Sequence, residues 1–137
     1  MAQEKLLKNE FQKVLSQSRE RLESAEILLR KRKYRDSISR SYYAAFDVIR
    51  ALLATRGIIT KTHAGAFRQF ALYFVKTKIF DKEFSDKLNR LYERRQQADY
   101  EWQEEFGKNI AQDSLLKAKE FINITEALFP KIFKGSE

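Results

Sequence analysis

The sequence predicts an all-α protein: an up-and-down bundle of about five helices that forms one domain over residues 1–137. Two observations indicate this fold class. The chain has only four glycines and one proline, too few for the many tight turns of an all-β protein. Apolar residues also recur at steps of three and four through most of the chain, which is the spacing of one helix face. At 137 residues, one domain is long enough to bury a hydrophobic core.

The first predicted helix runs from about residue 4 to residue 31. Seven of its residues share one face at helical spacing: Leu7, Phe11, Val14, Ser18, Leu22, Ala25 and Leu29. A cationic segment follows, and Asp36 is expected to cap a second helix that begins at Ser37. This second helix is predicted to end near Arg56, because Gly57 supplies a carboxyl-terminal stop.

Thr62 is expected to cap a third helix. Four apolar residues share one face of that helix: Phe67, Phe70, Ala71 and Phe74. A turn at residues 78–81 leads to a fourth predicted helix, over about 82–101. The segment QEEFGKN, residues 103–109, is predicted to be a loop. A final helix is then predicted over about 111–133, and it carries an apolar face: Leu115, Ala118, Ile122, Thr125 and Phe129.

The net charge of +8 at pH 7 is carried by the first 100 residues, because residues 101–137 contain more acids than bases. Such an excess favours anionic partners such as RNA, nucleotides or an acidic protein surface. An ordinary lysine-rich, solvated surface is the alternative interpretation. Cysteine is absent, no apolar run approaches the ~18 residues of a membrane span, and the amino terminus has no signal-peptide core. We therefore expect a cytoplasmic protein that does not enter a membrane.

The residue types exclude several kinds of active site. With His63 as the only histidine and no cysteine, a zinc site of ordinary nitrogen and sulfur ligands is not expected. The four glycines are scattered and form no phosphate-binding loop. A Ser-His-Asp triad would have to use His63 as its base, and nothing singles out a serine. We therefore expect neither a metal nor a cofactor.

Arg95 occupies a position at which a buried helix face would continue. Three apolar residues precede it at steps of four and three: Phe84, Leu88 and Leu91. Burying a guanidinium is costly unless it is paired or faces a cleft. Asp99 lies four residues later and can pair with Arg95 on the same face. The pair is either an ion pair that only anchors the helix, a phosphate clamp with Tyr100 beside it, or part of a dimer interface.

Two further candidates lie earlier in the chain. His63 is predicted just inside a helix start and follows Lys61, where free backbone N–H groups and the lysine favour an anion. A histidine with local hydrogen bonds at the helix start is the alternative. Tyr42 and Tyr43 are adjacent, so one is expected to be buried and the other partly exposed. The exposed hydroxyl could serve a groove or a partner, although core packing is the expected role of the segment as a whole.

Three segments resemble the HEPN domain (higher eukaryotes and prokaryotes nucleotide-binding), in its small stand-alone prokaryotic branch. They are the YYAAF segment at residues 42–46, the KTH-x-G turn at 61–65 with FVKT after it, and the R-x-x-A-D-Y string from Arg95 to Tyr100. The resemblance covers most of the chain, from about Leu22 to Phe129. Lys78 departs from the family pattern, which commonly has glycine after FVKT.

The resemblance implies a helical bundle that commonly forms a homodimer. Such proteins often work beside a minimal nucleotidyltransferase, in some cases as the toxin of a toxin–antitoxin pair. Many HEPN domains are metal-independent ribonucleases with an R-x(4–6)-H motif, in which arginine stabilises charge on phosphorus and histidine acts as general acid or base. This chain lacks that histidine, because the three permitted positions after Arg95 hold Tyr100, Glu101 and Trp102. Ribonuclease activity by the usual route is therefore not expected.

The sequence leaves three functional hypotheses open. The first is a HEPN-type module whose basic cleft binds a nucleotide, an RNA phosphate or a nucleotidyltransferase partner. Its candidate ligand-binding residues are Arg95, Asp99, Tyr100, Tyr43, Lys61 and His63. In this hypothesis Arg95 contacts the phosphate, and Asp99 orients the Arg95 side chain. The second is a divergent ribonuclease that uses Arg95 with His63 or Tyr100, and the third is a purely structural dimer subunit in which the Arg95–Asp99 pair only holds helices together.

Overall fold

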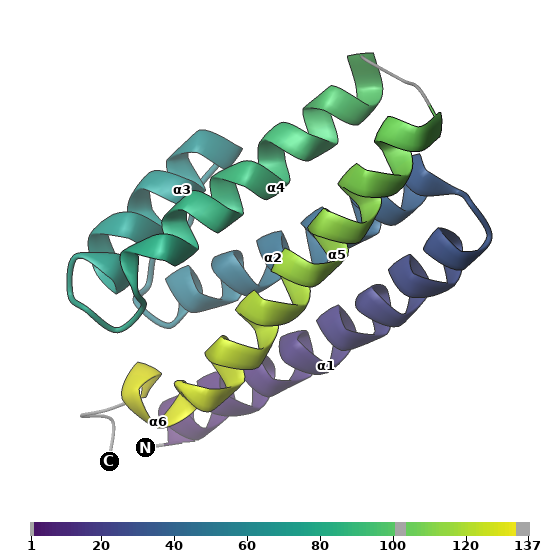
Figure 1. The fold of residues 1–137 in the computed structure, drawn as a ribbon. Coiled ribbons are helices and arrows are strands. Elements are labelled where there is room, and N and C mark those ends of the chain that lie inside the picture. Colours follow the sequence, from purple (N-terminus) through teal and green to yellow (C-terminus); the bar gives the residue numbers. More distant parts are fainter. Residues whose placement is uncertain (1, 101–103, 134–137) are drawn as a thin grey trace.

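A computed structural model describes residues 2–100 and 104–133, without the side chains of residues 2–4, 6, 99–100 and 104–106. Within these ranges all regular structure is helical and no strand is present (Figure 1). The elements are α1 (Ala2–Arg30), α2 (Tyr34–Ala54), α3 (His63–Phe70), the π-helix η1 (Ala71–Val75), α4 (Lys82–Tyr100), α5 (Glu104–Ala127) and α6 (Phe129–Ile132). The predicted all-α helical bundle is confirmed.

Helix α2 is the centre of the bundle. It packs against α1, α3, α4 and α5, which surround it in Figure 1. Its side chains explain this position, because 12 of its 21 residues are buried. Two of them, Ala44 and Ala45, are small and fully covered, so that neighbouring helices can approach closely. Side chains of α2 can therefore contact residues of all four of these helices.

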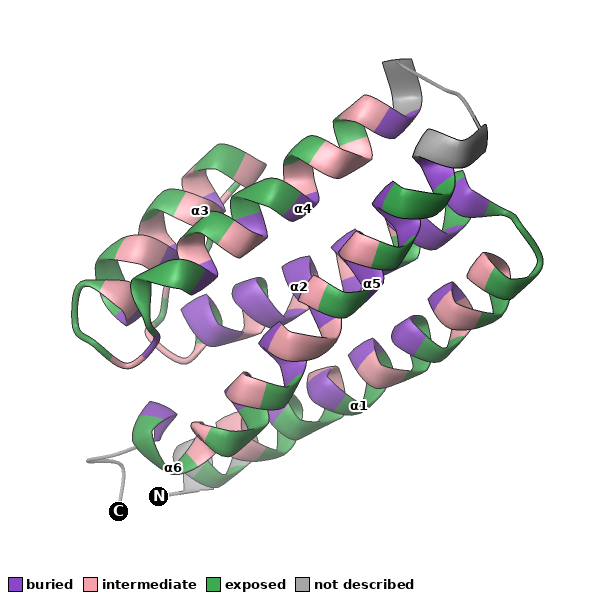
Figure 2. Ribbon diagram, in the orientation of Figure 1, coloured by how far each residue is buried: buried purple, intermediate pink, exposed green. Residues whose placement is uncertain are grey.

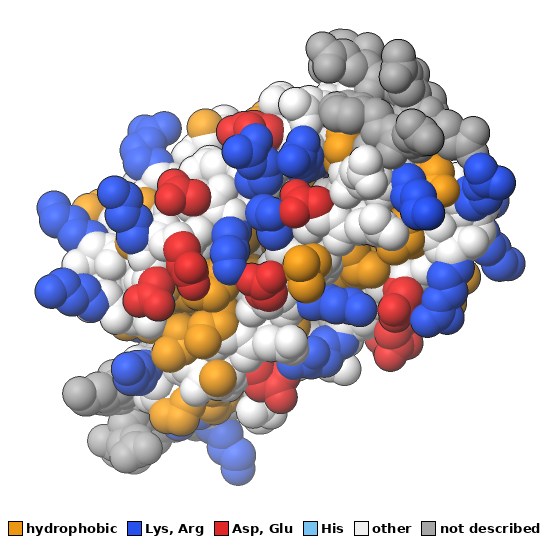
Figure 3. All heavy atoms as spheres, in the orientation of Figure 1, with side chains coloured by type: hydrophobic (Ala, Val, Ile, Leu, Met, Phe, Trp, Pro, Cys, Tyr) orange, Lys and Arg blue, Asp and Glu red, His pale blue; other side chains and the backbone are white. Residues whose placement is uncertain are grey.

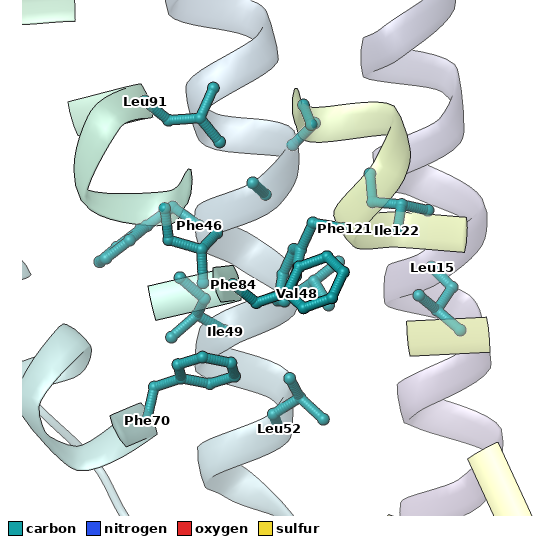
Figure 4. Close-up of a cluster of buried hydrophobic side chains, with 14 of the residues drawn as sticks. Leu15, Phe46, Val48, Ile49, Leu52, Phe70, Phe84, Leu91, Phe121 and Ile122 are labelled. Carbon is teal, nitrogen blue, oxygen red and sulfur yellow. The ribbon is translucent and has the colours of Figure 1, made fainter. Parts of the chain in front are cut away.

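The main core is rich in phenylalanine. Phe121 of α5 lies 5.8 Å from Phe70 of α3, 5.6 Å from Phe80 and 6.4 Å from Phe84 of α4, measured between ring centroids. Figure 4 shows part of this core, where side chains from several helices point into one cluster. In Figure 2 the buried residues lie on the sides of the helices that face one another. This core fixes α3 and α4 against α2, and these three helices carry the candidate site.

The second helix begins one turn earlier than its sequence predicts. Asp36 does not cap it, because α2 starts at Tyr34 and its cap residue, Lys33, makes no side-chain hydrogen bond to the helix. The reason is burial, since Tyr34 is only 5% exposed and packs in a small second core with Ile38. At the other end, Gly57 has the positive φ of +71° expected of a carboxyl-terminal stop.

The last helix differs from its prediction at both ends. The segment predicted as a loop, residues 103–109, is helical from Glu104 onward, so that part of the prediction is wrong. Ile110 and Ala111, both buried, lie in the second core, and these contacts favour an earlier helix start. The predicted final helix is also broken, because Pro130 lacks the N–H that would continue α5 and instead lies in the first turn of α6.

The third helix continues beyond α3 as the π-helix η1 before the turn that leads to α4. Phe70 and Phe74 are buried as predicted, with exposed fractions of 1% or less. None of the helices in the described part of the chain is both long and apolar enough to cross a membrane.

Candidate functional site

Arg95 lies at the edge of the core. Its three predecessors on the stripe are buried as predicted: Phe84, Leu88 and Leu91. Arg95 itself is partly exposed, and its guanidinium carbon lies 5.1 Å from the ring centre of Tyr43 and 5.7 Å from that of Tyr42. No carboxylate among the described side chains forms an ion pair with it. Two tyrosine rings therefore support this cation from α2.

The neighbouring Arg94 has a different environment. Its Nε atom lies 3.5 Å from Oδ2 of Asp113 on α5, and its NH1 group donates a hydrogen bond to Gln97. Lys117 also pairs with Asp113. Figure 3 shows acidic and basic side chains intermingled on this face of the molecule. Arg94 therefore joins α4 to α5, whereas Arg95 faces the aromatic residues of α2.

Tyr42 and Tyr43 differ in burial as the sequence predicts. Tyr42 is buried, with 1% of its surface exposed, and Tyr43 is partly exposed. Their ring centroids are 5.1 Å apart in an edge-to-face arrangement, which is favourable for aromatic pairs. The rings can thus form one surface under Arg95 while only Tyr43 faces solvent.

His63 is the first residue of α3. Thr62 caps this helix as predicted, since its Oγ1 accepts a hydrogen bond of 2.9 Å from the backbone N–H of Gly65. A Cβ atom at position 65 would lie 2.9 Å from that same oxygen, so the tight KTH-x-G turn leaves no room for a side chain there. The cap fixes the backbone from which His63 extends toward α2.

The hydrogen bond of His63 is not local, so the alternative of a locally bonded cap histidine is wrong. Its Nδ1 atom is hydrogen-bonded to the hydroxyl of Tyr42, 21 residues away in the chain. Its ring stacks on Phe46 at 4.3 Å between centroids and lies 5.5 Å from the ring of Tyr42. His63 and Arg95 therefore both contact Tyr42, so the fold brings these two candidates together on one side chain.

The protonation states in this cluster follow from burial and from Arg95. Burial lowers the pKa of His63 below its usual value of 6.5, and the positive charges of Arg95 and Arg50 lower it further. Burial raises the pKa of Tyr42, and the neighbouring Tyr43 and Tyr92 raise it further. The positive charge of Arg95 lowers the pKa of Tyr42, but this effect is smaller. At neutral pH the imidazole is therefore uncharged and the Tyr42 hydroxyl keeps its proton.

The direction of this hydrogen bond depends on the tautomer of the imidazole. In the tautomer whose Nδ1 accepts from the Tyr42 hydroxyl, the neutral ring carries its proton on Nε2 and is a hydrogen-bond donor there. The site then presents two kinds of donor, an imidazole N–H and a guanidinium, and no described acidic group. Such a set is suited to an anion.

Tyr92 is a member of the site that the sequence reading missed. Its ring lies 5.6 Å from His63 and 5.8 Å from Tyr42 and from Phe67. Its place three residues before Arg95 puts it on the same face of α4 and could have identified it. We call the following residues the Arg95 cluster: Tyr42, Tyr43, Phe46, His63, Tyr92 and Arg95.

Three other predicted site residues are not placed in the cluster. Lys61 is exposed just before α3 and forms none of the described ion pairs. The side chains of Asp99 and Tyr100 lie outside the described residues, so the Arg95–Asp99 pair and the role of Tyr100 stay predictions. No group of three histidine or acidic side chains that could hold a metal ion occurs among the described residues.

The fold and the site together define a small helical bundle with an arginine and a histidine held on shared aromatic rings. The family model for the HEPN domain matches residues 11–128, and the chain belongs to the HEPN domain family. It is 36% identical over 130 residues to a protein of Methanocaldococcus jannaschii named "Putative toxin", covering 93% of this chain and 88% of that protein. A second protein of the same name and organism is 35% identical over 69% of this chain and 70% of its own length. A UPF0332 protein of Thermotoga maritima is 33% identical over 88% of this chain and 94% of its own length.

Proposed function

We propose that this HEPN-family protein is a toxin-like module whose Arg95 cluster binds the phosphate of a nucleotide or of RNA. The observation that carries the proposal is the environment of Arg95: a partly exposed guanidinium supported by two tyrosine rings, with no described carboxylate paired to it. A planar guanidinium held in this way is ready to bind a phosphate through two parallel hydrogen bonds. The purely structural alternative would instead have Arg95 fully buried, whereas it is partly exposed.

His63 supports the same proposal. In the tautomer whose Nδ1 accepts from Tyr42, its Nε2–H is a second donor beside Arg95, and its neutral state avoids placing two full positive charges together when the site is empty. The net charge of +8 adds a long-range attraction for polyanions. Phosphate binding thus uses both nitrogen donors of the cluster, the guanidinium and the imidazole N–H.

We also propose that the chain forms a homodimer and works with a minimal nucleotidyltransferase in a toxin–antitoxin-like pair. The names of the two Methanocaldococcus relatives and the HEPN resemblance support this part of the proposal. Co-expression with a nucleotidyltransferase encoded next to this chain, followed by sedimentation of the purified product, would test it. Monomeric protein that does not co-purify with the nucleotidyltransferase would contradict it.

A divergent ribonuclease is the second candidate, favoured by the shared contact of His63 and Arg95 with Tyr42. As a general base, His63 would have to accept a proton on Nε2, which requires the opposite tautomer, with Nδ1–H donating to the Tyr42 oxygen. Binding is favoured over cleavage because the chain lacks the histidine of the R-x(4–6)-H motif after Arg95. Cleavage of RNA in the presence of EDTA that disappears in both Arg95→Ala and His63→Ala proteins would establish the ribonuclease.

The main test compares Arg95→Ala with Arg90→Ala. Loss of a charge-assisted hydrogen bond is expected to weaken binding of a 5′-labelled single-stranded RNA by about tenfold or more. Arg90 is a matched control, because it lies on the same helix, carries the same charge, and pairs within that helix with Glu93. Fluorescence anisotropy measures both affinities. Equal weakening by the two substitutions would show that only the overall charge matters and would contradict the proposal.

A further inference from the structure

An open cavity of about 390 Å³ lies between α3 and α4, next to the Arg95 cluster. The side chains that give this groove its chemistry are Phe67, Arg68, Ser85, Asn89 and Tyr92. Its volume falls within the range of pockets that bind small ligands and cofactors.

The groove and the Arg95 cluster share the side chain of Tyr92. Tyr92 lines the groove and also lies 5.6 Å from the ring of His63. Along α4, Ser85, Asn89, Tyr92 and Arg95 follow one another at steps of four, three and three, so they share one face of the helix. At ~1.5 Å per residue, about 15 Å separates the two ends of this row. One ligand can therefore occupy the groove and reach Arg95.

The walls of the groove combine aromatic and polar groups. Phe67 and Tyr92 supply rings, with their centroids 5.8 Å apart. Asn89 is held by a hydrogen bond of 2.9 Å from its Nδ2 atom to the backbone carbonyl of Ser85. This bond leaves the amide oxygen and one N–H of Asn89 available, next to the Ser85 side chain. Aromatic faces bind bases by stacking, and amide and hydroxyl groups bind their edges.

A second arginine lies at this groove. Arg68 is exposed and has no hydrogen bond or ion pair among the described residues. The groove therefore has a cation on its own wall and another, Arg95, in the adjoining cluster. An occupant with an aromatic base and a phosphate matches this pattern of rings, amide and cations in both shape and charge.

We propose that the α3–α4 groove binds the base of a nucleoside phosphate whose phosphate is held by Arg95. This inference rests on the proposed function and adds the subsite that distinguishes a nucleotide from a bare phosphate. The same chemistry is offered by a free mononucleotide and by a nucleotide within single-stranded RNA. In the second case Arg68 contacts the phosphate of a neighbouring nucleotide.

The test blocks the groove without touching Arg95. Ala64 is exposed on α3 and lines the groove, so Ala64→Phe places a ring in the space for the base. Ala127→Phe makes the same change at an exposed position at the end of α5 and is the matched control. The probes are 5′-AMP, a single-stranded tetra-adenylate, and ribose 5-phosphate, which has no base; calorimetry measures their affinities.

Ala64→Phe is expected to weaken binding of 5′-AMP and of tetra-adenylate by about tenfold, as expected for loss of a stacked base, and to leave ribose 5-phosphate unchanged. Arg95→Ala is expected to weaken all three. Unchanged 5′-AMP affinity in Ala64→Phe, together with a loss in Arg95→Ala, would overturn the subsite but keep the phosphate site. No loss in Arg95→Ala would overturn the proposed function itself.

Three further variants complete the experiment. Tyr92→Phe keeps the ring and is expected to bind 5′-AMP normally, whereas Tyr92→Leu removes the ring and is expected to bind it weakly. Equal affinities in these two variants would contradict stacking on Tyr92.

Arg68→Ala separates the two sources of the ligand. If the natural ligand is RNA, this substitution is expected to weaken binding of tetra-adenylate but not of 5′-AMP. Equal affinity of the wild-type protein for both probes, with no effect of Arg68→Ala, assigns the groove to a free mononucleotide.

Discussion

Tyr42 connects the two donor groups of the site. Its buried hydroxyl would cost free energy without a partner, and His63 supplies that partner. Its ring also lies 5.7 Å below the guanidinium of Arg95. One side chain therefore sets the orientation of the imidazole and the surface beneath the arginine. Substitution of Tyr42 would disturb both groups together, so their roles are separated only by variants of His63 and Arg95.

The lowered pKa of His63 predicts a dependence of stability on pH. Between the lowered pKa in the folded protein and the usual value of 6.5, the unfolded chain binds more protons than the folded chain. The free energy of unfolding is therefore expected to decrease as the pH falls from neutrality through this window. Urea denaturation at pH 7.5, 6.5 and 5.5 measures the change.

His63→Phe is the control for this prediction. A phenyl ring can keep the stacking contact with Phe46, but it cannot take up a proton. We expect the variant to lose less stability than the wild type over the same pH range, because most carboxylates titrate at lower pH. An identical slope in the two proteins would show that His63 does not bind the proton responsible.

At the scale of the helix, α4 shows what apolar spacing predicts and what it does not. The steps that lead from Leu88 to Leu91 place Arg95 on the line of the buried face, and the burial of both leucines confirms that line. The long arginine side chain nevertheless directs its guanidinium onto the tyrosines of α2. This outcome depends on where α2 packs, and the periodicity of α4 carries no information about it.

The predicted starts of two helices, α2 and α5, were wrong for a related reason. Apolar spacing found each of the predicted helices, but Tyr34 extends α2 and Ile110 extends α5 through burial in the small second core. Each of these residues finds its partners on another helix. Local sequence signals predicted the Thr62 cap correctly, because its hydrogen bond joins residues only three positions apart. They missed the starts of α2 and α5, because contacts with other helices determine them.

The packing of α5 on α3 and α4 leads to a prediction about stability. Phe121 is fully buried and lies within 5.8 Å of the ring centroids of Phe70 and Phe80. Phe121→Ala is expected to lower the free energy of unfolding by about 3–5 kcal/mol, from lost burial and the cavity that remains. Leu116→Ala on the same helix is the control, because Leu116 is 56% exposed. Urea denaturation would contradict the prediction if both variants lost the same stability.

At the scale of the whole molecule, the site is assembled from three helices. Tyr42 comes from α2, His63 from α3 and Arg95 from α4, so no short sequence motif contains the cluster. Sequence reasoning identified Arg95, His63 and Tyr43 as separate candidates. Their convergence depends on the crossing of the helices, which the shared phenylalanine core determines. The groove between α3 and α4 could not be predicted for the same reason.

The net charge of +8 raises the question of whether RNA binding would reflect a general attraction or a direct contact at Arg95. The two differ in their dependence on salt. Each phosphate neutralised on a single strand contributes about −0.7 to the slope of the logarithm of the binding constant against the logarithm of salt concentration. Arg95→Ala is therefore expected to reduce the magnitude of that slope by about 0.7, because it removes one direct contact.

Affinities for single-stranded RNA measured between about 50 and 200 mM salt would give this slope for the wild type, Arg95→Ala and Arg90→Ala. Arg90 carries the same charge but pairs with Glu93, so its removal should lower the affinity slightly at low salt and leave the slope nearly unchanged. If both substitutions change the slope equally, RNA is bound by the overall field of the protein and Arg95 has no special part in it. A smaller slope in Arg95→Ala alone would instead identify a phosphate contact at Arg95, because the slope is proportional to the number of phosphates that the protein neutralises.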